Sequence, residues 1–430
     1  MTTTFMESAP LLKVSEMAET LISSEIIRLA NEIKDRIGKG QKIYNFTIGD
    51  FDPKIFPIPK EFENEIISAY KKGETNYPPP NGISDLRQAV SRFLHTRGNL
   101  EYNENQLLIS GGARPLIYGV FQAVVDPGDN VVFPVPSWNN NHYCHLTRAN
   151  AIPVETSAAN NFMPTADDLK SHISQASLIA LCSPLNPTGT TFTRQQLKDI
   201  CTLILDENRK RGENRKPVYL LYDQIYWMLT LGNTVHFDPV SLFPEMKNYT
   251  IYIDGISKAF ASTGVRVGWA FGPTKVINKM RAILSHVGAW APKAEQVACA
   301  KYLFQDDNMD SYLLQIKGKI SERLNAFYAG IMSLKQEGFK VDAIAPQAAI
   351  YLAIQINLRD LKTPEGKKIT TAEDATQYIL DEAKIALVPF NAFGATHSSS
   401  WYRLSVGTAT MEDVTKSIDN LRNALRKLSA

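Results

Sequence analysis

A lysine and an arginine with complementary chemistry lie close together, just after a short apolar run. Lys258 ends the segment YIDGISK, and Arg266 follows eight residues later, between Gly264 and Gly268. A lysine amine can form an imine with a carbonyl compound, and a guanidinium can hold a phosphate through paired hydrogen bonds. Most lysines are solvated surface groups, so this pair predicts a covalent site only if other segments supply matching groups.

Polar residues directly follow several short apolar runs, and these runs alternate with amphipathic helical windows such as 84–98. The runs that we expect to be strands are 130–133, 178–182, 218–222 and 250–253. This alternation predicts an α/β fold with a mostly parallel central sheet. In such sheets the ligand crevice lies outside the carboxyl ends of the strands. We therefore expect these residues to meet there: Ser137, Trp138, Asn186, Asp223, Tyr226 and Lys258.

The two ends of the chain predict a smaller second domain. A helical window carries Ile26, Leu29, Ile33 and Ile37, and further strands are expected over 350–356 and 385–388. Thr410 with Asp413 predicts the capped start of a terminal helix whose apolar face extends to Leu428. We therefore expect a three-layer sandwich over residues 51–320. A smaller α+β domain is expected from residues 1–50 and 321–430.

Composition excludes several classes of protein. The 430 residues are 44% hydrophobic and 21% charged, as in ordinary globular proteins. The 46 basic residues nearly balance the 44 acidic ones, so we expect no nucleic-acid or membrane partner. The cysteines lie far apart, at positions 144, 182, 201 and 299, which predicts neither a disulfide framework nor a metal site. No signal-peptide pattern opens the chain, so a cytoplasmic location is expected.

Three polar residues after the predicted strands could bind one aromatic cofactor. Asp223 follows 218–222 and could pair with a ring nitrogen, although an aspartate there could also cap the next helix. Asn186, in the stretch NPTG, could donate to a phenolic oxygen together with Tyr226, although that stretch is also typical of a tight turn. An imine-forming lysine with these partners is the set that a pyridoxal phosphate enzyme requires.

A phosphate cup is predicted at the turn SGGARP. Gly112, Ala113 and Arg114 stand there after the apolar 107–109, and Pro115 falls in the first turn of the following helix, so backbone amides would face the ligand. Three side chains could add donors to the phosphate: Arg266, Ser257 and Tyr77. Trp138 could stack on the cofactor ring, or could be a half-buried core aromatic.

In order and spacing, these motifs resemble the pyridoxal-phosphate-dependent aminotransferases of fold type I, in classes I and II, and in particular the aspartate aminotransferases. The resemblance spans nearly the whole chain. The matching segments are Gly49 to Pro53, Tyr77 with Gly82, Leu86 and Arg87, Pro136 to Trp138, Asn186 to Gly189, Asp223 to Tyr226, Ser257 to Arg266, and Arg403 to Ser405.

The resemblance implies a transaminase with a ping-pong mechanism. Lys258 would hold pyridoxal 5'-phosphate as an internal aldimine, with Asp223 and Tyr226 as the other catalytic residues. The amino group would pass from an L-amino acid to a 2-oxo acid such as 2-oxoglutarate. The α-carboxylate would be gripped by Arg403, with Gly49, Asn186 and Trp138 completing the substrate site. The family also implies a homodimer with shared active sites, in which Tyr77 reaches the neighbour's phosphate.

Several positions depart from the family pattern. Gly255 stands where many relatives place a phosphate-binding serine, so one hydrogen bond would be missing or supplied elsewhere. Ala348 and Phe390 replace glycines, which would narrow the substrate entrance. Ala113 stands where some aspartate-using relatives carry a lysine for the distal carboxylate. A distal contact could come instead from Arg114, Lys293 or Trp290, so aspartate is an open expectation.

Two other functions remain open from the sequence. A β-lyase could use the same site residues on the same scaffold, because only control of the reaction intermediate differs. A regulatory protein with an aminotransferase-like sensor domain is a candidate of another class. It would need a DNA-binding module, and the nearly neutral stretch before Gly49 is too short to supply one.

Overall fold

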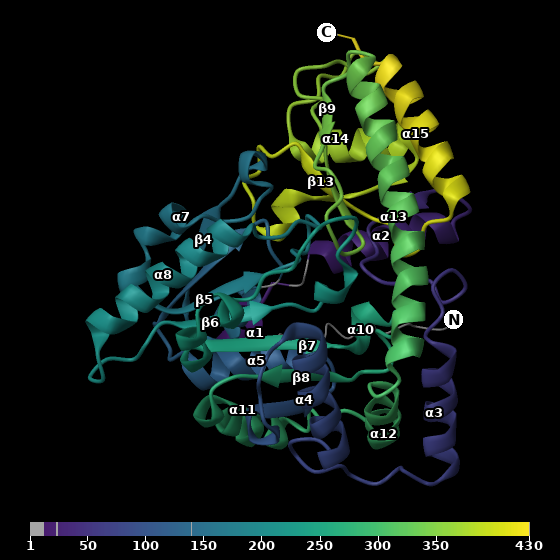
Figure 1. Cartoon of the computed structure of the whole chain (residues 1–430). Coiled ribbons are helices and arrows are strands. Elements are labelled where there is room, and N and C mark those ends of the chain that lie inside the picture. The colour runs from purple at the N-terminus through teal and green to yellow at the C-terminus, as the bar shows by residue number, and fades with distance from the viewer. Residues whose placement is uncertain (1–12, 23–24, 139, 430) are drawn as a thin grey trace, which may run out of the picture.

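A seven-stranded sheet forms the centre of the larger part of the molecule (Figure 1). The structure is a computed structural model that describes residues 13–22, 25–138 and 140–429. The strand order is β2-β8-β7-β6-β5-β3-β4, and every neighbouring pair is parallel except those made by β8. The strands are β2 (Leu107–Ser110), β3 (Asn130–Val135), β4 (Asn150–Glu155), β5 (Ala176–Cys182), β6 (Tyr219–Asp223), β7 (Thr250–Gly255) and β8 (Gly268–Phe271).

Helices cover both faces of this sheet, so the larger part has three layers. Successive residues of β7 show why: Ile251 and Ile253 belong to a buried cluster that includes residues of α5 and α11, whereas Tyr252 belongs to the cluster that includes residues of α4 and α8. The helices of this part are α3 (Lys60–Lys71), α4 (Ser84–Gly98), α5 (Ala113–Val124), α6 (Asn140–Thr147), α7 (Ala166–Lys170), α8 (Arg194–Arg211), α9 (Pro239–Leu242), α10 (Ile256–Ala259), α11 (Thr274–Val287) and α12 (Lys293–Tyr302). The predicted three-layer α/β fold is confirmed.

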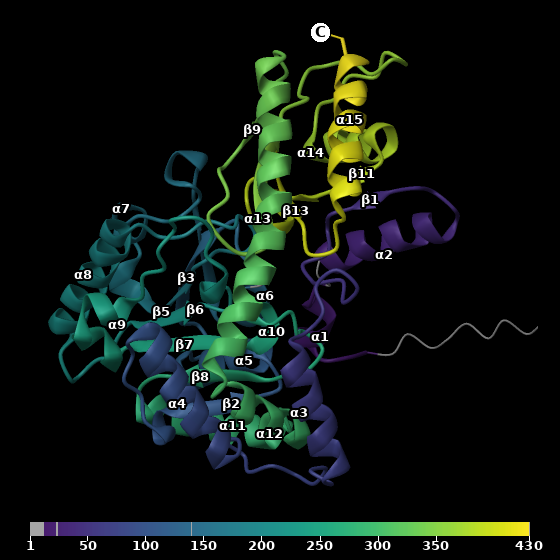
Figure 2. The same cartoon turned by 45° about the vertical axis from the view of Figure 1, so that its right-hand side comes forward.

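The two chain ends come together beside the sheet, where α2 lies near α15 in both views (Figures 1 and 2). Strand β1 pairs in parallel with β11, and a four-stranded antiparallel sheet has the order β12-β13-β10-β9. The elements are α2 (Glu25–Gly38), β1 (Tyr44–Asn45), α13 (Asp306–Gln336), β9 (Val341–Ala343), β10 (Tyr351–Ile356), α14 (Ala372–Tyr378), β11 (Ile385–Ala386), β12 (Val388–Pro389), β13 (Trp401–Ser405) and α15 (Met411–Arg426). The domain boundaries stay a prediction, and the one at residue 320 falls inside α13.

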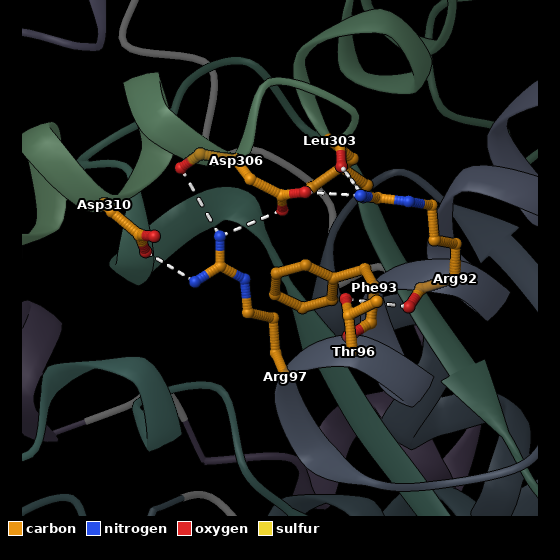
Figure 3. A network of polar contacts seen from close by, with 7 residues as sticks. All are labelled: Arg92, Phe93, Thr96, Arg97, Leu303, Asp306 and Asp310. Atoms are coloured by element: carbon orange, nitrogen blue, oxygen red, sulfur yellow. Dashed lines mark hydrogen bonds and ion pairs between the residues drawn. The ribbon is translucent and has the colours of Figure 1, made fainter.

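The long helix α13 runs from the large sheet to the smaller part, and its first turn is fastened to α4 (Figures 1 to 3). Asp306 is bound by two arginines of α4: Arg92 reaches one carboxylate oxygen, and Arg97 reaches the other at 2.9 Å. Arg97 also pairs with Asp310 one turn further along α13, and Arg92 donates to the carbonyl of Leu303 at 3.2 Å. This network fastens the N-terminal end of α13 to α4, one of the helices that cover the large sheet.

Most predicted elements are confirmed, with three corrections. The expected single strand over 385–388 is wrong, because its two halves pair in different sheets as β11 and β12. Ile37 does not belong to the buried face of α2, since 42% of it is exposed. Leu428 lies beyond the end of α15, although the predicted capping box of Thr410 with Asp413 is present.

The short helix α1 (Glu16–Thr20) lies against α6, where a ring nitrogen of His145 is 2.9 Å from the carbonyl oxygen of Met17. Among the described residues, no helix is long and apolar enough to cross a membrane.

Candidate active site

The predicted site residues meet in one cavity of about 660 Å³ beyond the carboxyl ends of β3, β5, β6 and β7. This is where a ligand crevice is expected in an open parallel sheet. The predicted residues that line it are Gly49, Ala113, Arg114, Trp138, Asn186, Asp223, Tyr226, Ser257, Lys258, Arg266 and Arg403. Two predicted residues do not line the cavity: Gly112 is buried next to the lining residue Ala113, and Tyr77 is exposed on the surface.

Lys258 reaches the cavity from α10, the short helix that follows β7. Its amine donates to the carbonyl oxygen of Gly49 at 2.7 Å. Burial lowers the pKa of Lys258 to about 8, the positive charges of Arg403, Arg114 and Arg266 act in the same direction, and the negative charge of Asp50 opposes them. The site thus makes the neutral amine, which an imine or a proton transfer requires, easier to form than on an exposed lysine.

Asp223 ends β6 and lies opposite Cys182 in the neighbouring strand. Burial raises the pKa of Asp223 to about 6, while the backbone amide of Ile225 and the charge of Lys258 counteract that rise. Its side chain accepts from the Ile225 amide at 3.0 Å and does not cap the following short helix, Trp227–Leu229. A buried carboxylate of this kind can receive a positively charged ring nitrogen.

The turn before α5 forms a cradle of backbone groups and one guanidinium. Arg266 donates from Nη1 to the carbonyl of Thr263 at 2.7 Å and from Nη2 to that of Gly111 at 2.8 Å, so its orientation is fixed. Gly112 stands at the N-cap of α5 with φ +95°, and a β-carbon there would lie 2.2 Å from Nη2 of Arg266. The glycine lets the backbone and the guanidinium come close enough to hold one anion.

Three glycines pack on one another behind this cradle. A β-carbon on Gly255 would meet the α-carbon of Gly268 at 2.8 Å, and one on Gly268 would meet the carbonyl carbon of Gly112 at 2.7 Å. The obstacles are backbone atoms, which cannot rotate away. A residue larger than glycine at position 255 would therefore push β7 and β8 apart.

Gly268→Ala is expected to lower the free energy of unfolding by about 1 to 3 kcal/mol, through overpacking against Gly112. Urea denaturation would measure the loss. Gly318→Ala is the matched control: Gly318 lies in α13 with nothing within 4 Å of the added carbon, and we expect a gain of up to about 1 kcal/mol. Equal stability of the two variants would contradict the packing argument.

Arg403 projects from β13 and is almost wholly buried. Its Nη1 donates to the side-chain oxygen of Asn186 at 3.0 Å, and its Nη2 donates to the carbonyl of Thr47 at 2.6 Å. Its Nε is buried without a hydrogen-bond partner among the described residues. The rings of Tyr351 and Phe393 lie 4.8 and 4.9 Å from the guanidinium carbon. A planar, pre-oriented fork of this kind suits a carboxylate.

Two candidate functional residues were not predicted from the sequence. The hydroxyl of Tyr351 lies 2.7 Å from that of Tyr226, and its ring lies beneath Arg403, so it supports both residues. Tyr351 lies within the predicted strand 350–356, and no sequence signal distinguished it from a core residue. The other is Asp50, which lines the cavity and accepts from the hydroxyl of Thr263. Its only sequence signal was its place in the motif that begins at Gly49.

Other predicted contacts fall outside the cavity. Tyr77 is 82% exposed and packs edge-on against Trp290, and Lys293 pairs with Glu74 at 2.9 Å. The expectation that Ala348 and Phe390 narrow the substrate entrance is wrong, because neither lines the cavity. Both residues are fully buried. The backbone amide of Ala348 donates to the carbonyl of Gly189, and the ring of Phe390 packs against the rings of Phe162 and Trp401.

The residues present fit pyridoxal 5'-phosphate. One wall offers an anion cradle at Gly112 and Arg266, another offers the buried Asp223, and Lys258 lies on the same cavity with its amine pKa lowered. The unsatisfied Nε of buried Arg403 adds a donor for a carboxylate. In the described part of the chain, no group of three or more metal-ligating side chains gathers, and the four cysteines are free.

Comparisons with known proteins agree with this site. The family of class I and II aminotransferases matches residues 41–421. Aspartate aminotransferases from Bacillus sp. (strain YM-2) and Thermotoga maritima are each 28% identical to the chain. The match covers 94% of this chain and 98% of the Bacillus protein, and 96% of this chain and 99% of the Thermotoga protein. These relatives do not favour the β-lyase or the regulatory alternative.

Solved structures share the fold. The aspartate aminotransferase of Rhizobium meliloti superposes with a TM-score of 0.86 at 24% identity, over 97% of this chain and 100% of that one. The enzyme of Thermus thermophilus gives a TM-score of 0.84 at 23% identity, over 96% of this chain and 100% of that one. With the family match over most of its length, the chain belongs to the pyridoxal-phosphate-dependent aminotransferases of classes I and II.

Proposed function

We propose that this aminotransferase takes a dicarboxylic L-amino acid, aspartate, as donor and returns the amino group to a 2-oxo acid such as 2-oxoglutarate. The observation that carries the proposal is an unpaired cation in the cavity. Among the described residues, four basic side chains line it, and Lys258, Arg266 and Arg403 each bind a protein oxygen. Arg114 alone makes no hydrogen bond or ion pair with the described residues, so its charge is free for a ligand.

The position of Arg114 supports recognition of a distal carboxylate. Its guanidinium lies over the ring of Trp138, with its carbon 5.2 Å from the ring centroid, which restricts its motion without using its donors. Arg403 then has the α-carboxylate as its natural ligand, beside Asn186. Two cations on one cavity match a substrate with two carboxylates, and the relatives that carry the name aspartate aminotransferase support the same choice.

The roles of the remaining residues follow from their positions. The bound cofactor supplies an electron sink for the substrate α-carbon. Lys258 would act as the base that moves a proton to and from that carbon, Asp223 would hold the ring nitrogen, and Tyr226 and Asn186 would hold the ring oxygen. The phosphate would be held by Arg266, Ser257, the amide of Ala113 and the Gly112 turn. Trp138, which lines the same cavity, would stack on the ring.

A homodimer with shared active sites is part of the proposal. Tyr77 is 82% exposed and does not line the cavity of its own chain, although the family motif assigns it to a phosphate. A second copy that brought Tyr77 to the neighbouring cavity would give this exposed ring a partner. A cytoplasmic location is also proposed, since free thiols suit a reducing compartment.

A panel of amino acids assayed against 2-oxoglutarate tests the donor. We expect aspartate to be preferred, and Arg114→Met to raise its KM by about 10- to 100-fold, since one hydrogen bond to a charged group contributes about 1.5 to 3 kcal/mol. Alanine, which has no distal carboxylate, should react with unchanged KM.

Arg281→Met is the matched control, since Arg281 is an exposed arginine on α11 that does not line the cavity. It should leave both substrates unaffected. Preference of the wild-type protein for alanine or an aromatic donor would remove the aspartate proposal.

A further inference from the structure

Asp50 joins two segments of the site, the one that accepts from Lys258 and the loop that leads to Arg266. Its carboxylate accepts from the hydroxyl of Thr263 at 2.6 Å and from the backbone amide of Phe51 at 2.8 Å, both on the same oxygen. Thr263 belongs to the loop that leads to Arg266, and its carbonyl accepts from that guanidinium. The residue before Asp50 is Gly49, whose carbonyl accepts from the Lys258 amine. One carboxylate thus links the acceptor of Lys258 to the anion cradle.

The backbone around Asp50 is itself tightly held. The amide of Asp52 donates to the carbonyl of Gly407 at 2.9 Å, and a β-carbon on Gly407 would lie 2.0 Å from the carbonyl oxygen of Asp50. Gly407 follows β13, the strand that carries Arg403. The backbone that presents the Asp50 carboxylate is therefore held against the segment that follows β13, the strand of Arg403.

Charge gives the carboxylate a second effect. Among the described residues, Asp50 and Asp223 are the two acidic side chains that line the cavity, against four basic ones. The charged groups that shift the pKa of Lys258 are Asp50, Arg403, Arg114 and Arg266. The charge of Lys258 in turn lowers the pKa of Asp223. Among the four groups that act on Lys258, Asp50 raises the pKa of the amine, whereas Arg403, Arg114 and Arg266 lower it.

We propose that Asp50 is a positioning residue for the reaction: Thr263 and the Phe51 amide fix its carboxylate where it holds the protonated amine of Lys258 against the Gly49 carbonyl. After each proton transfer the amine is charged and must stay in reach of the substrate carbon. A fixed counter-charge on the wall keeps it there, whereas three arginines would drive it away. This inference rests on the role proposed for Lys258.

The test is a pH titration of the visible absorption band of the cofactor-loaded protein. Asp50→Asn keeps the size and a hydrogen-bond acceptor but removes the charge. The midpoint should move to lower pH by about one unit, because the protonated form at Lys258 loses its favourable neighbour. In the same variant kcat should fall roughly tenfold through misplacement of the amine, while the KM for the amino acid changes little.

Two further variants separate charge from structure. Asp50→Glu keeps the charge and should return the midpoint close to the wild-type value. Asp52→Asn is the matched control in the same segment, because its carboxylate accepts from the Lys54 amide and does not line the cavity. It should titrate as the wild type does.

Two classes of result overturn the inference, and they are distinguishable from failure of the proposed function. An unchanged midpoint in Asp50→Asn, or equal shifts in Asp50→Asn and Asp50→Glu, would remove the role of Asp50 alone. A wild-type protein whose visible band is absent would overturn the assignment of Lys258 and this inference together.

Discussion

Lys258→Ala is expected to lower kcat for transamination by a factor of about 10⁴ or more, the largest effect of any substitution in the chain. The amine is unique among the described lysines in lining the cavity, and the site is built around it. Burial lowers its pKa to about 8, its hydrogen bond goes to Gly49, and Asp50 restrains its charge. No neighbouring amine of the described chain can take its place, so the loss should persist at every pH. Steady-state kinetics with aspartate and 2-oxoglutarate would measure it.

The covalent link gives an independent readout. Borohydride treatment of the cofactor-loaded protein should fix a pyridoxyl group on Lys258, detectable by mass spectrometry of its peptide, and the alanine variant should remain unlabelled. Lys301→Ala is a suitable control, because that lysine pairs with Glu65 on the surface and lies away from the cavity. It should keep both turnover and labelling. Normal turnover in Lys258→Ala would refute the assignment.

The sequence predicted the gathering of the main site residues because one physical rule governs it. Asn186, Asp223 and Lys258 each follow a short apolar run, and the carboxyl ends of neighbouring parallel strands must lie at one edge of a sheet. The rule needs no side-chain detail. The location of these three residues therefore followed once the runs were identified as parallel strands.

Contacts between distant segments did not follow from the sequence. Tyr226 and Tyr351 share a hydroxyl contact across 125 positions, and Asp50 meets Thr263 across 213. A tyrosine at the start of an apolar strand predicts core packing equally well, so the pairing depends on how the small sheet meets the large one. The prediction that Ala348 narrows the substrate entrance was wrong for the same reason. The family pattern identifies the position, but it does not show whether a side chain there faces the cavity or the core.

Arg403→Lys should lower kcat/KM for α-amino acids by about 10²- to 10³-fold, although the charge is kept. Two nitrogens of the planar Arg403 guanidinium donate hydrogen bonds to Asn186 and Thr47, and the group still has N–H donors left for a ligand. A lysine ammonium is a single point and cannot reach both partners and a carboxylate together. The loss of a buried, charged hydrogen-bond set costs about 3 to 4 kcal/mol, which corresponds to that factor. Kinetics at low substrate concentration would measure it.

The reaction of a simple primary amine separates this role from damage to the site. An amine without an α-carboxylate makes no use of Arg403, so its slow reaction with the cofactor-loaded enzyme should have the same rate in the wild type and in Arg403→Lys. Arg426→Lys controls for the substitution, since Arg426 is largely exposed on α15 and pairs with Glu337. Equal losses for the amino acid and the simple amine would mean that Arg403 supports the fold of the cavity. A loss confined to the amino acid ties the guanidinium to the carboxylate, because that group is the difference between the two substrates.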